Sequence, residues 1–441
     1  MEFPIPSSIF TQYLKSAAES GIMASRKLFY GGYPMKKSIL KNYAKLIVRT
    51  GINVAKGQEV IIGAELDQPE FVKMLVEECY RAGASKVTVD WSYGPLEKVH
   101  IRGRSLKTMS KVEAWEEEKL RHASEVLPCR IHLLSADPDG LKGVNTAKLA
   151  KARQARYQIT RPYSDKMEGK YQWCVAAVPG AAWAKKVFPN LSKSQAIEKL
   201  WEAILSASRV TDDPIAAWEE HNRDLRSRCE YLNSLNIREL HYYASNGTDL
   251  RVGMIPECEW KGGADASLTG HVYNANIPSE EVFITPKSGK AEGIVYSTMP
   301  LSYQGKLIEN FSIRFEDGKA VEAHAEKNED VLLEMIAMDE GASRLGECAL
   351  VAHDSPISNA GILYYNTLFD ENASCHLALG RGYADTLKDF DRYTLEECRK
   401  LGVNESMIHV DFMIGCADMS IDGITESGET VAIFRNGNWA F

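Results

Sequence analysis

Two ionisable side chains share one face of an apolar segment near the end of the chain. In MIHVDFMIG, His409 and Asp411 are two residues apart, so a strand places both on one face and the apolar residues on the other. Such a strand can hold a histidine and a carboxylate rigidly beside a metal ion. Taken alone, the pattern is more often that of a half-exposed strand whose polar face meets water.

The stretch YYNTLFDENASCHLALGRGY, residues 364–383, concentrates ionisable groups among apolar ones. Asp370, Glu371, His376 and Tyr383 fall within it, a density that solubility alone does not explain. Taken alone, His376 is more often a core histidine with satisfied hydrogen bonds than a metal ligand. It becomes a candidate ligand because of the ionisable residues around it.

Carboxylates also interrupt two other apolar segments. Glu280 and Glu281 lie in IPSEEVFITP, where strand alternation points only one of them inward, and Glu347 opens ECALVA. A carboxylate in an apolar strand is costly unless it is paired or bound to a cation. The alternative for each glutamate is charge on an edge strand, which protects against aggregation. Both interpretations stay open at this point.

Together these residues form a mixed oxygen and nitrogen ligand set without thiolate: Glu281, Glu347, His376, His409 and Asp411. Such a set suits Zn²⁺, Co²⁺ or Mn²⁺, with Mg²⁺ as a further candidate, and a carboxylate bridging two ions about 3.5–4 Å apart is typical of aminopeptidases. The chain has no HExxH motif, which excludes a mononuclear site of the thermolysin type. It also has no GxGxxG after a strand, no P-loop and no GxSxG elbow.

The N-terminal half alternates predicted strands and helices. Strands are expected at 59–64 and 86–91, with a helix of period 3.6 at 71–84 between them, which is the signature of a parallel βαβ unit. Asp67 is expected to cap this helix and Gly83 to end it. Further strands are predicted near His132 and from Trp173. Ser192 and Gln195 have capping-box spacing, and Asp213 before Pro214 starts another helix. The class is α/β, with a Rossmann-like or flavodoxin-like parallel sheet.

From about residue 236 the pattern changes to strands without intervening helices. Runs at 237–244, 249–254, 293–299 and 311–326 alternate apolar and polar residues, and Asp317-Gly318 predicts a hairpin turn. We therefore expect an α/β scaffold domain at 36–235 and a C-terminal α+β domain, rich in antiparallel strands and carrying the site, at 236–441.

Composition narrows the class of protein. A chain of 441 residues with 44% hydrophobic residues can fill two domains, and its formal net charge of -8 argues against a nucleic-acid partner. No run of about eighteen apolar residues predicts a membrane helix, and the first residues do not form a secretory signal. The nine cysteines form no CxxC pair, which is typical of reduced thiols. We expect a cytoplasmic protein without a membrane partner.

The motifs together resemble the thermophilic-type metalloaminopeptidases, the family of aminopeptidases T and S and PepS. The resemblance runs from NYAKLIVRTGINVAKGQEV through AAWAKKVFPN, GTDLRVGM and NIPSEEVFITP to HVDFMIG, and LFDENASCHLALG is highly specific. It covers nearly the whole chain from about residue 35, so residues 1–35 are interpreted as an N-terminal extension. It implies a binuclear site made of two glutamates, two histidines and an aspartate with a tyrosine close by. Matched motif by motif, these are Glu281, Glu347, His376, His409, Asp411 and Tyr383.

The resemblance implies a metal-dependent aminopeptidase that releases the N-terminal residue of short peptides. Two divalent ions would bind the free amine and polarise the scissile carbonyl, and a water activated by them would attack. Glu280 and Glu371 are the candidates for general base, and Tyr383 would bind metal or stabilise the oxyanion. A homodimer is expected.

Two alternatives stay open. One is another binuclear amidase or dipeptidase on the same scaffold, which would not require a free amine. The other is a non-catalytic binding protein that metal stabilises, which would turn over no peptide with any metal.

Overall fold

Four parallel strands form the N-terminal sheet, as the βαβ pattern predicts. The computed structural model describes residues 37–441, so the predicted extension at 1–35 lies outside the described residues. The strands are β1 (Glu59–Glu65), β2 (Lys86–Ser92), β3 (Cys129–Leu134) and β4 (Trp173–Ala177). Their order β2-β1-β3-β4, with every neighbouring pair parallel, is flavodoxin-like. The predicted α/β class of this half is confirmed.

Helices precede the first of these strands, connect the strands and follow the last one. They are α2 (Lys37–Leu46) with its continuation η1 (Ile47–Gly51), α3 (Pro69–Ala82), α4 (Gly94–Gly103), α5 (Leu106–Ser110), α6 (Ala114–Val126), α7 (Thr146–Met167), α8 (Ala181–Val187), α9 (Lys193–Ala207) and α10 (Pro214–Ser234). Gly83 ends α3 with a φ of 109°, where a side chain would be strained. Ser192 and Gln195 form the predicted capping box of α9, and Asp213 caps α10.

Asp67 does not cap α3, so that prediction is wrong. The N-cap residue is Gln68, which makes no side-chain capping bond. The Oδ1 atom of Asp67 instead accepts a hydrogen bond of 3.2 Å from the backbone N of Ala181, the first residue of α8. Because the carboxyl ends of parallel strands lie along one edge of the sheet, a carboxylate after β1 can reach the helix that follows β4.

Antiparallel strands make up the C-terminal half, as predicted. One sheet has the path β12-β13-β11-β6-β5-β18-β19-β20, with β14 paired to β13; a second has the order β17-β16-β15-β10-β7; β8 pairs β9. The strands are β5 (Ile237–Tyr243), β6 (Asp249–Met254), β7 (Lys261–Gly262), β8 (Asp265–Ala266), β9 (Val272–Tyr273), β10 (Val282–Ile284), β11 (Pro286–Tyr296), β12 (Leu301–Tyr303), β13 (Lys306–Glu316), β14 (Lys319–Lys327), β15 (Leu345–Leu350), β16 (His376–Gly380), β17 (His409–Met413), β18 (Ser420–Thr425), β19 (Thr430–Arg435) and β20 (Asn438–Trp439).

The two sheets share one apolar core. Leu250, Phe311 and Phe315 from the larger sheet and Leu377 and Phe412 from the smaller one belong to the same cluster of buried side chains. Burying these side chains stabilises the half by the hydrophobic effect. The predicted Asp317-Gly318 turn joins β13 to β14, and both of its residues have positive φ, as a tight hairpin requires.

Short elements lie between and around the strands of the smaller sheet. They are α11 (Glu329–Ile336), η2 (Gly341–Ser343), α12 (Pro356–Asn359), α13 (Thr367–Asp370), η3 (Glu371–Ala373), η4 (Ala384–Thr386), η5 (Phe390–Arg392) and α14 (Leu395–Leu401).

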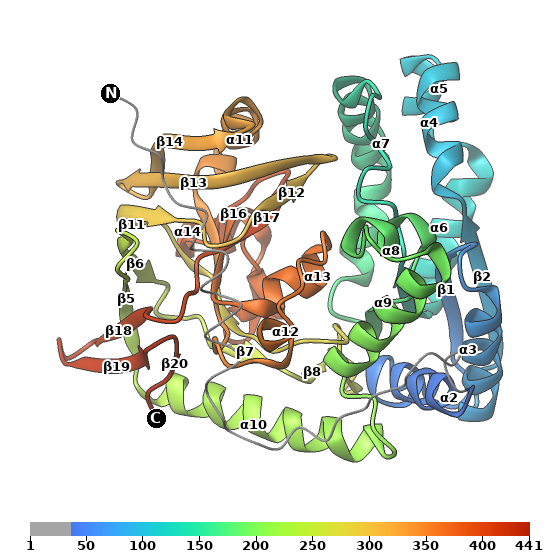
Figure 1. Cartoon of the computed structure of the whole chain (residues 1–441), viewed down its shortest axis with the longest axis horizontal. Helices are drawn as coiled ribbons and strands as arrows, with labels where there is room; N and C mark the ends of the chain where they lie inside the picture. Colours follow the sequence, from blue (N-terminus) through green and yellow to red (C-terminus); the bar gives the residue numbers. More distant parts are fainter. Residues whose placement is uncertain (1–36) are drawn as a thin grey trace. The chain divides into compact units, whose positions relative to one another are not determined.

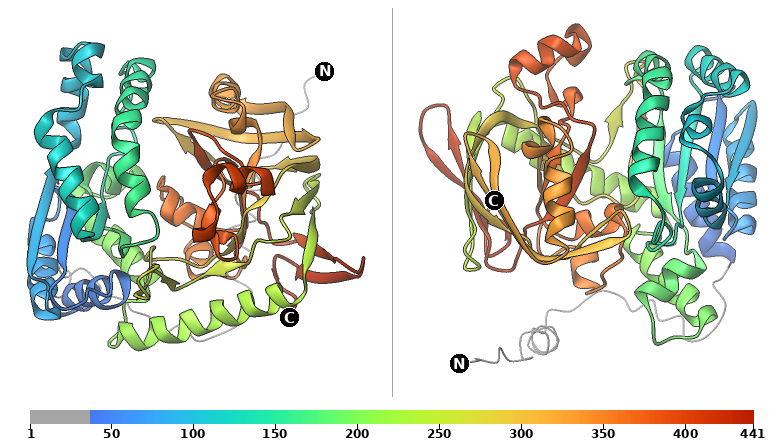
Figure 2. Two further views of the ribbon diagram at one scale, coloured as in Figure 1. Left: turned by 180° about the vertical axis from the view of Figure 1, so that it is seen from behind. Right: turned by 90° about the horizontal axis from the view of Figure 1, so that it is seen from above.

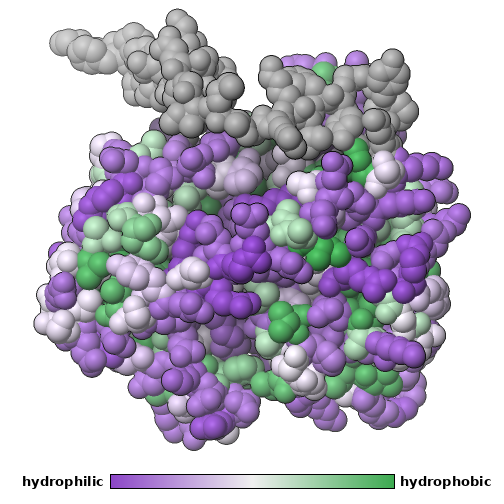
Figure 3. Space-filling model, turned by 90° about the horizontal axis from the view of Figure 1, so that it is seen from below, coloured by the Kyte–Doolittle hydropathy of each residue, from purple (hydrophilic) through white to green (hydrophobic). Residues whose placement is uncertain are grey.

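Helix α10 joins the two halves. In Figure 1 it runs along the bottom from α2 toward β18, and it contacts α2 on one side and β7 and β10 on the other. Both views in Figure 2 show the blue-to-green helices and strands gathered beside the yellow-to-red antiparallel half. Figure 3 shows a face on which hydrophilic side chains predominate and hydrophobic ones occur in small separate groups. Within residues 37–441, no helix is long and apolar enough to cross a membrane.

Candidate metal centre

Three neighbouring strands bring four of the predicted ligands onto one face of the smaller sheet. Glu347 in β15 lies opposite Ala378 in β16, and Ala378 lies opposite Asp411 in β17. His376 and His409 share this face because each is two residues from a member of this row. Ala378, with its small side chain, is fully buried in this row between the two carboxylates.

A bulge in β15 sets the direction of Glu347. Leu345 pairs with Leu379 and Glu347 with Ala378, so Gly346 is an extra residue without a partner. A Cβ atom at Gly346 would lie 2.5 Å from the carbonyl oxygen of Gly380, which explains why glycine is needed here. Bulges beside functional sites commonly re-aim one side chain, and this one points Glu347 to the site face.

Glu280 and Glu281 precede β10 and point in opposite directions. Glu281 turns to the site face, with its Oε2 atom 3.3 Å from Nε2 of His376. Glu280 turns away and forms a bidentate ion pair with Arg209, in the connection between α9 and α10. Both carboxylates are nevertheless buried, each 7% exposed, because the α/β half covers Glu280. The predicted alternation therefore holds for direction, because only Glu281 turns to the site face, whereas the burial of Glu280 was not predicted.

Strand order also excludes the alternative of edge-strand charge. β15, which carries Glu347, is the middle strand of five, and β10 lies between β15 and β7. Neither Glu347 nor Glu281 therefore marks an edge of this sheet.

The ligand atoms form two overlapping groups. Glu281, Glu347 and His376 place one ligand atom each within 4.8 Å of one another, and so do Glu347, His409 and Asp411. Glu347 belongs to both groups, which is the arrangement that a carboxylate bridging two ions requires.

Both histidines direct their Nε2 atoms toward carboxylates. Nδ1 of His409 lies 2.6 Å from the carbonyl oxygen of Arg381, and Nδ1 of His376 lies 3.1 Å from that of Ser374. A carbonyl only accepts, so each Nδ1 carries the hydrogen in a neutral ring and leaves the Nε2 lone pair free for a ligand role. This use of a backbone carbonyl to orient a histidine is common around bound metals.

The pKa shifts of the clustered groups indicate that positive charge between them would stabilise the site. Burial, added to the neighbouring carboxylates, raises the pKa of Glu347 to about 7 and that of Glu371 well above its usual range. Burial opposes protonation of His376, yet the carboxylates of Glu281 and Glu347 raise its pKa to about 10. The buried Oδ1 atom of Asp411 accepts no hydrogen bond of good geometry, although Nε2 of His409 is 3.1 Å away. Divalent cations would satisfy all of these groups, so the residues fit the metal that the sequence predicts.

Tyr383 and Glu371 lie beside this cluster. The Oη atom of Tyr383 is 3.0 Å from Nε2 of His409, and the residue is 38% exposed at the rim of the site. Glu371, at the start of η3, senses the charges of Asp411, Glu281 and Glu347 and forms no ion pair among the described residues.

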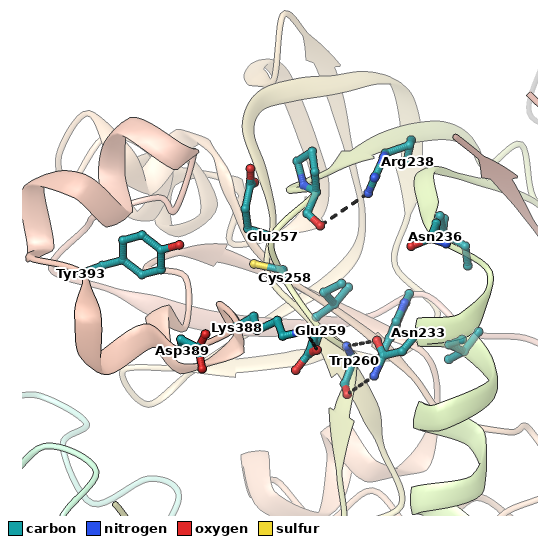
Figure 4. A pocket seen from close by; sticks show the side chains of 14 residues that line it. Asn233, Asn236, Arg238, Glu257, Cys258, Glu259, Trp260, Lys388, Asp389 and Tyr393 are labelled. Atoms are coloured by element: carbon teal, nitrogen blue, oxygen red, sulfur yellow. Dashed lines mark hydrogen bonds and ion pairs between the residues drawn. The ribbon is translucent and has the colours of Figure 1, made fainter. Parts of the chain in front are cut away.

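A cavity of about 380 Å³ lies apart from this centre. Its walls include Arg238, Glu257, Glu259 and Lys388, and none of the six predicted site residues or base candidates lines it (Figure 4). Lys388 and Glu259 approach to 3.9 Å, and the charges of the lining are mixed. The cavity therefore adds no chemistry to the predicted site.

Several contributors to this geometry were not predicted. The sequence analysis did not single out Ala378, Gly346 or Arg209, because none of these residue types is a usual metal ligand. Gly346, before a glutamate in an apolar run, was the one available signal of a bulge. Arg209 had no signal, because it acts on a residue 71 positions away.

Comparison with known proteins supports the same interpretation. A family model described as thermophilic metalloprotease (M29) matches residues 36–439. Aminopeptidase AmpS of Bacillus subtilis (strain 168) is 43% identical over 404 residues, which cover 91% of this chain and 98% of that relative. Aminopeptidase T of Thermus thermophilus is 40% identical over 405 residues, with the same two coverages.

Solved structures agree with these matches. Wild-type AmpT from Thermus thermophilus has a TM-score of 0.84 at 39% identity and covers 92% of this chain and 100% of its own. A 2,5-dihydroxypyridine dioxygenase from Pseudomonas putida KT2440, with a TM-score of 0.51 and 11% identity, shares the fold alone. The resemblance inferred from the motifs is confirmed, and the chain belongs to the thermophilic metalloprotease (M29) family.

Proposed function

We propose that this metalloaminopeptidase of the M29 family releases the N-terminal residue of short peptides at a centre that holds two divalent cations. The observation that carries the proposal is the pair of ligand groups that share Glu347. Glu281 and His376 would complete one ion's protein ligands, and His409 and Asp411 the other's, with Tyr383 next to the second. The oxygen and nitrogen donors suit Zn²⁺, Co²⁺ or Mn²⁺, with Mg²⁺ as a further candidate.

When bound, the ions would supply Lewis acidity, polarising the scissile carbonyl and lowering the pKa of water in the site. The chain's own groups handle the protons. Glu371 is our choice of general base, because it lies among the carboxylates without a cationic side chain of its own, and burial raises its pKa well above the usual value for a glutamate. It would take the proton of the attacking water and return it to the leaving amine.

Glu280 is the weaker candidate for this role. Both of its carboxylate oxygens are engaged by the guanidinium group of Arg209, on the side away from the site. A base needs a free oxygen within reach of the proton it accepts.

Tyr383 is placed to stabilise the tetrahedral state. Its hydroxyl lies at the rim beside His409, where it can donate a hydrogen bond to an oxygen that becomes negative during attack. We propose this role in place of direct metal binding, because Glu281, Glu347, His376, His409 and Asp411 already supply a complete set of ligands.

A free-amine requirement separates this function from that of another binuclear amidase. We would assay leucyl-p-nitroanilide beside its N-acetylated form, with Co²⁺ or Zn²⁺ added to chelator-treated protein. We expect cleavage of the free-amine substrate alone. Equal cleavage of both would refute an aminopeptidase, and turnover of no peptide with any metal would favour a binding protein.

The finer expectations remain proposals. The homodimer and the preference for short peptides rest on the family resemblance. The cytoplasmic location rests on the composition, and the division into a scaffold at 36–235 and a site-bearing part at 236–441 rests on the change in strand pattern. Sedimentation analysis tests the dimer, and a series of peptides of increasing length tests the size limit.

A further inference from the structure

The segment that carries Glu281 is held in place from both halves of the protein. Nε2 of His221, in α10, lies 2.7 Å from the carbonyl oxygen of Ser279 and donates a hydrogen bond to it. The backbone N of Glu280 donates a bond of 2.7 Å to Oδ1 of Asn372. These contacts fix the main chain immediately before Glu281.

The third contact is the ion pair between Arg209 and Glu280. Nη2 of Arg209 donates a hydrogen bond of 2.8 Å to Oε2 of Glu280, and Nη1 donates a second one to Oε1. The Glu280 side chain is 8% exposed and that of Arg209 is 21% exposed. Two parallel charge-assisted bonds in a buried setting fix orientation as well as distance.

The backbone of Arg209 is unusual for this residue type. It follows α9 as the C′ residue of a Schellman motif: the N of Arg209 bonds to the carbonyl oxygen of Ser206, and the N of Val210 to that of Leu205. Its φ is +52°, the left-handed region where such motifs usually place glycine. This backbone conformation disfavours a residue with a side chain, so the presence of arginine here points to a role for its side chain.

The turn that presents Arg209 is itself fixed. Nε1 of Trp218, a fully buried residue of α10, donates a hydrogen bond of 2.8 Å to the carbonyl oxygen of Ser208. The Trp218 ring packs edge-on against His221, with ring centroids 5.5 Å apart. The α9–α10 corner (Figure 1) thus presents Arg209 and His221 to the same short segment on one rigid support.

We propose that Arg209 is a positioning residue: its bidentate ion pair with Glu280 fixes the segment that aims the neighbouring Glu281 at the metal centre. Adjacent residues of an extended segment face opposite ways, so a grip on the Glu280 side chain sets the direction of Glu281. The inference rests on the proposed function, because it assigns Glu281 to the metal. It gives the α/β half a part in the site beyond that of a scaffold.

The test is the affinity and spectrum of bound Co²⁺, measured on the full chain. Removing Arg209 alone would leave a buried carboxylate without a partner, so the informative change is the double variant Arg209→Met/Glu280→Met, which removes both charges. We expect it to fold, to bind Co²⁺ at least tenfold more weakly and to show an altered d–d absorption spectrum. We expect kcat for leucyl-p-nitroanilide to fall with little change in KM.

Arg209→Lys is the conservative variant. It keeps the charge but not the bidentate geometry, so its Co²⁺ affinity should lie between those of the parent and the double variant. Should the double variant fail to fold, Arg209→Lys carries the test, and an affinity equal to the parent's would overturn the proposal.

The matched control is Arg435→Met/Asp422→Asn, which removes an ion pair joining β18 and β19 away from the centre. It should bind Co²⁺ as the parent does. Binding and spectrum unchanged in a folded Arg209→Met/Glu280→Met protein would overturn this inference alone. Failure of the parent itself to bind Co²⁺ would refute the proposed function, and the inference with it.

Discussion

Replacing Glu347 by glutamine should have opposite effects on the metal-free and the metal-loaded protein. Burial raises the pKa of Glu347 from 4.5 to about 7 in the metal-free chain. A carboxyl whose pKa is higher in the folded than in the unfolded state destabilises the fold as pH rises through that interval, and the full penalty is present at pH 8. The difference corresponds to about 3 kcal/mol at 1.36 kcal/mol per pKa unit. Glutamine keeps the shape and removes that penalty.

The expected change in melting temperature follows from the size of the chain. With an unfolding entropy of about 2.1 cal/mol/K per residue over 441 residues, about 3 kcal/mol corresponds to about 3–4 °C. Metal-free Glu347→Gln should therefore melt about 3–4 °C above the metal-free parent at pH 8. It should also bind Co²⁺ at least ~100-fold more weakly, which is a loss of about 2.7 kcal/mol or more in binding free energy. The loss should be this large because Glu347 is a proposed bridging ligand, and removing a ligand weakens binding more than removing a residue that only orients one.

Scanning calorimetry of chelator-treated protein and isothermal titration with Co²⁺ measure the two effects. Glu322→Gln is the matched control, because Glu322 lies on the exposed strand β14 and pairs with Arg314 far from the centre. It should leave both quantities unchanged. A lower melting temperature for metal-free Glu347→Gln, or unaltered Co²⁺ binding, would refute the reasoning that a buried charge is held here for the metal.

Two further outcomes are expected. Glu371→Gln should lower kcat at least ~100-fold while Co²⁺ stoichiometry stays that of the parent, measured by steady-state kinetics and metal analysis; an undiminished kcat would exclude Glu371 as the base. Tyr383→Phe should lower kcat about 10–100-fold with less than a tenfold change in Co²⁺ affinity, and a larger loss of affinity would instead mark the tyrosine as a ligand.

Local signals predicted much of the fold. The capping box at Ser192, the end of α3 at Gly83 and the Asp317-Gly318 hairpin depend on hydrogen bonds or dihedral angles within a few residues, so their sequences suffice to predict them. The prediction that Asp67 caps α3 was wrong because a distant contact, not a local one, determines the partner of its carboxylate. Its carboxylate had a local helix to cap, but the sheet brought a different helix start, 114 residues away, within reach.

The site was predictable in its residue types and not in its geometry. Strand alternation places His409 and Asp411 on one face, but nothing local indicates that Ala378 lies between Glu347 and Asp411 in the sheet. That arrangement depends on the pairing register of three strands and on one bulge, which are set by tertiary packing.

The proposed roles of Glu280 and Glu371 show the same limit. Both are carboxylates near predicted ligands, and the sequence offers no reason to prefer either. The structure separates them because Arg209 engages Glu280, whereas Glu371 faces the carboxylate cluster without an ion pair among residues 37–441.

A crystal structure of the Co²⁺-loaded protein, with anomalous difference density measured at the cobalt edge, tests the two-ion centre most directly. We expect two peaks about 3.5–4 Å apart, both within bonding distance of Glu347, one beside His376 and the other beside His409. A single peak, or two peaks that do not share Glu347, would contradict the binuclear centre proposed for this protein.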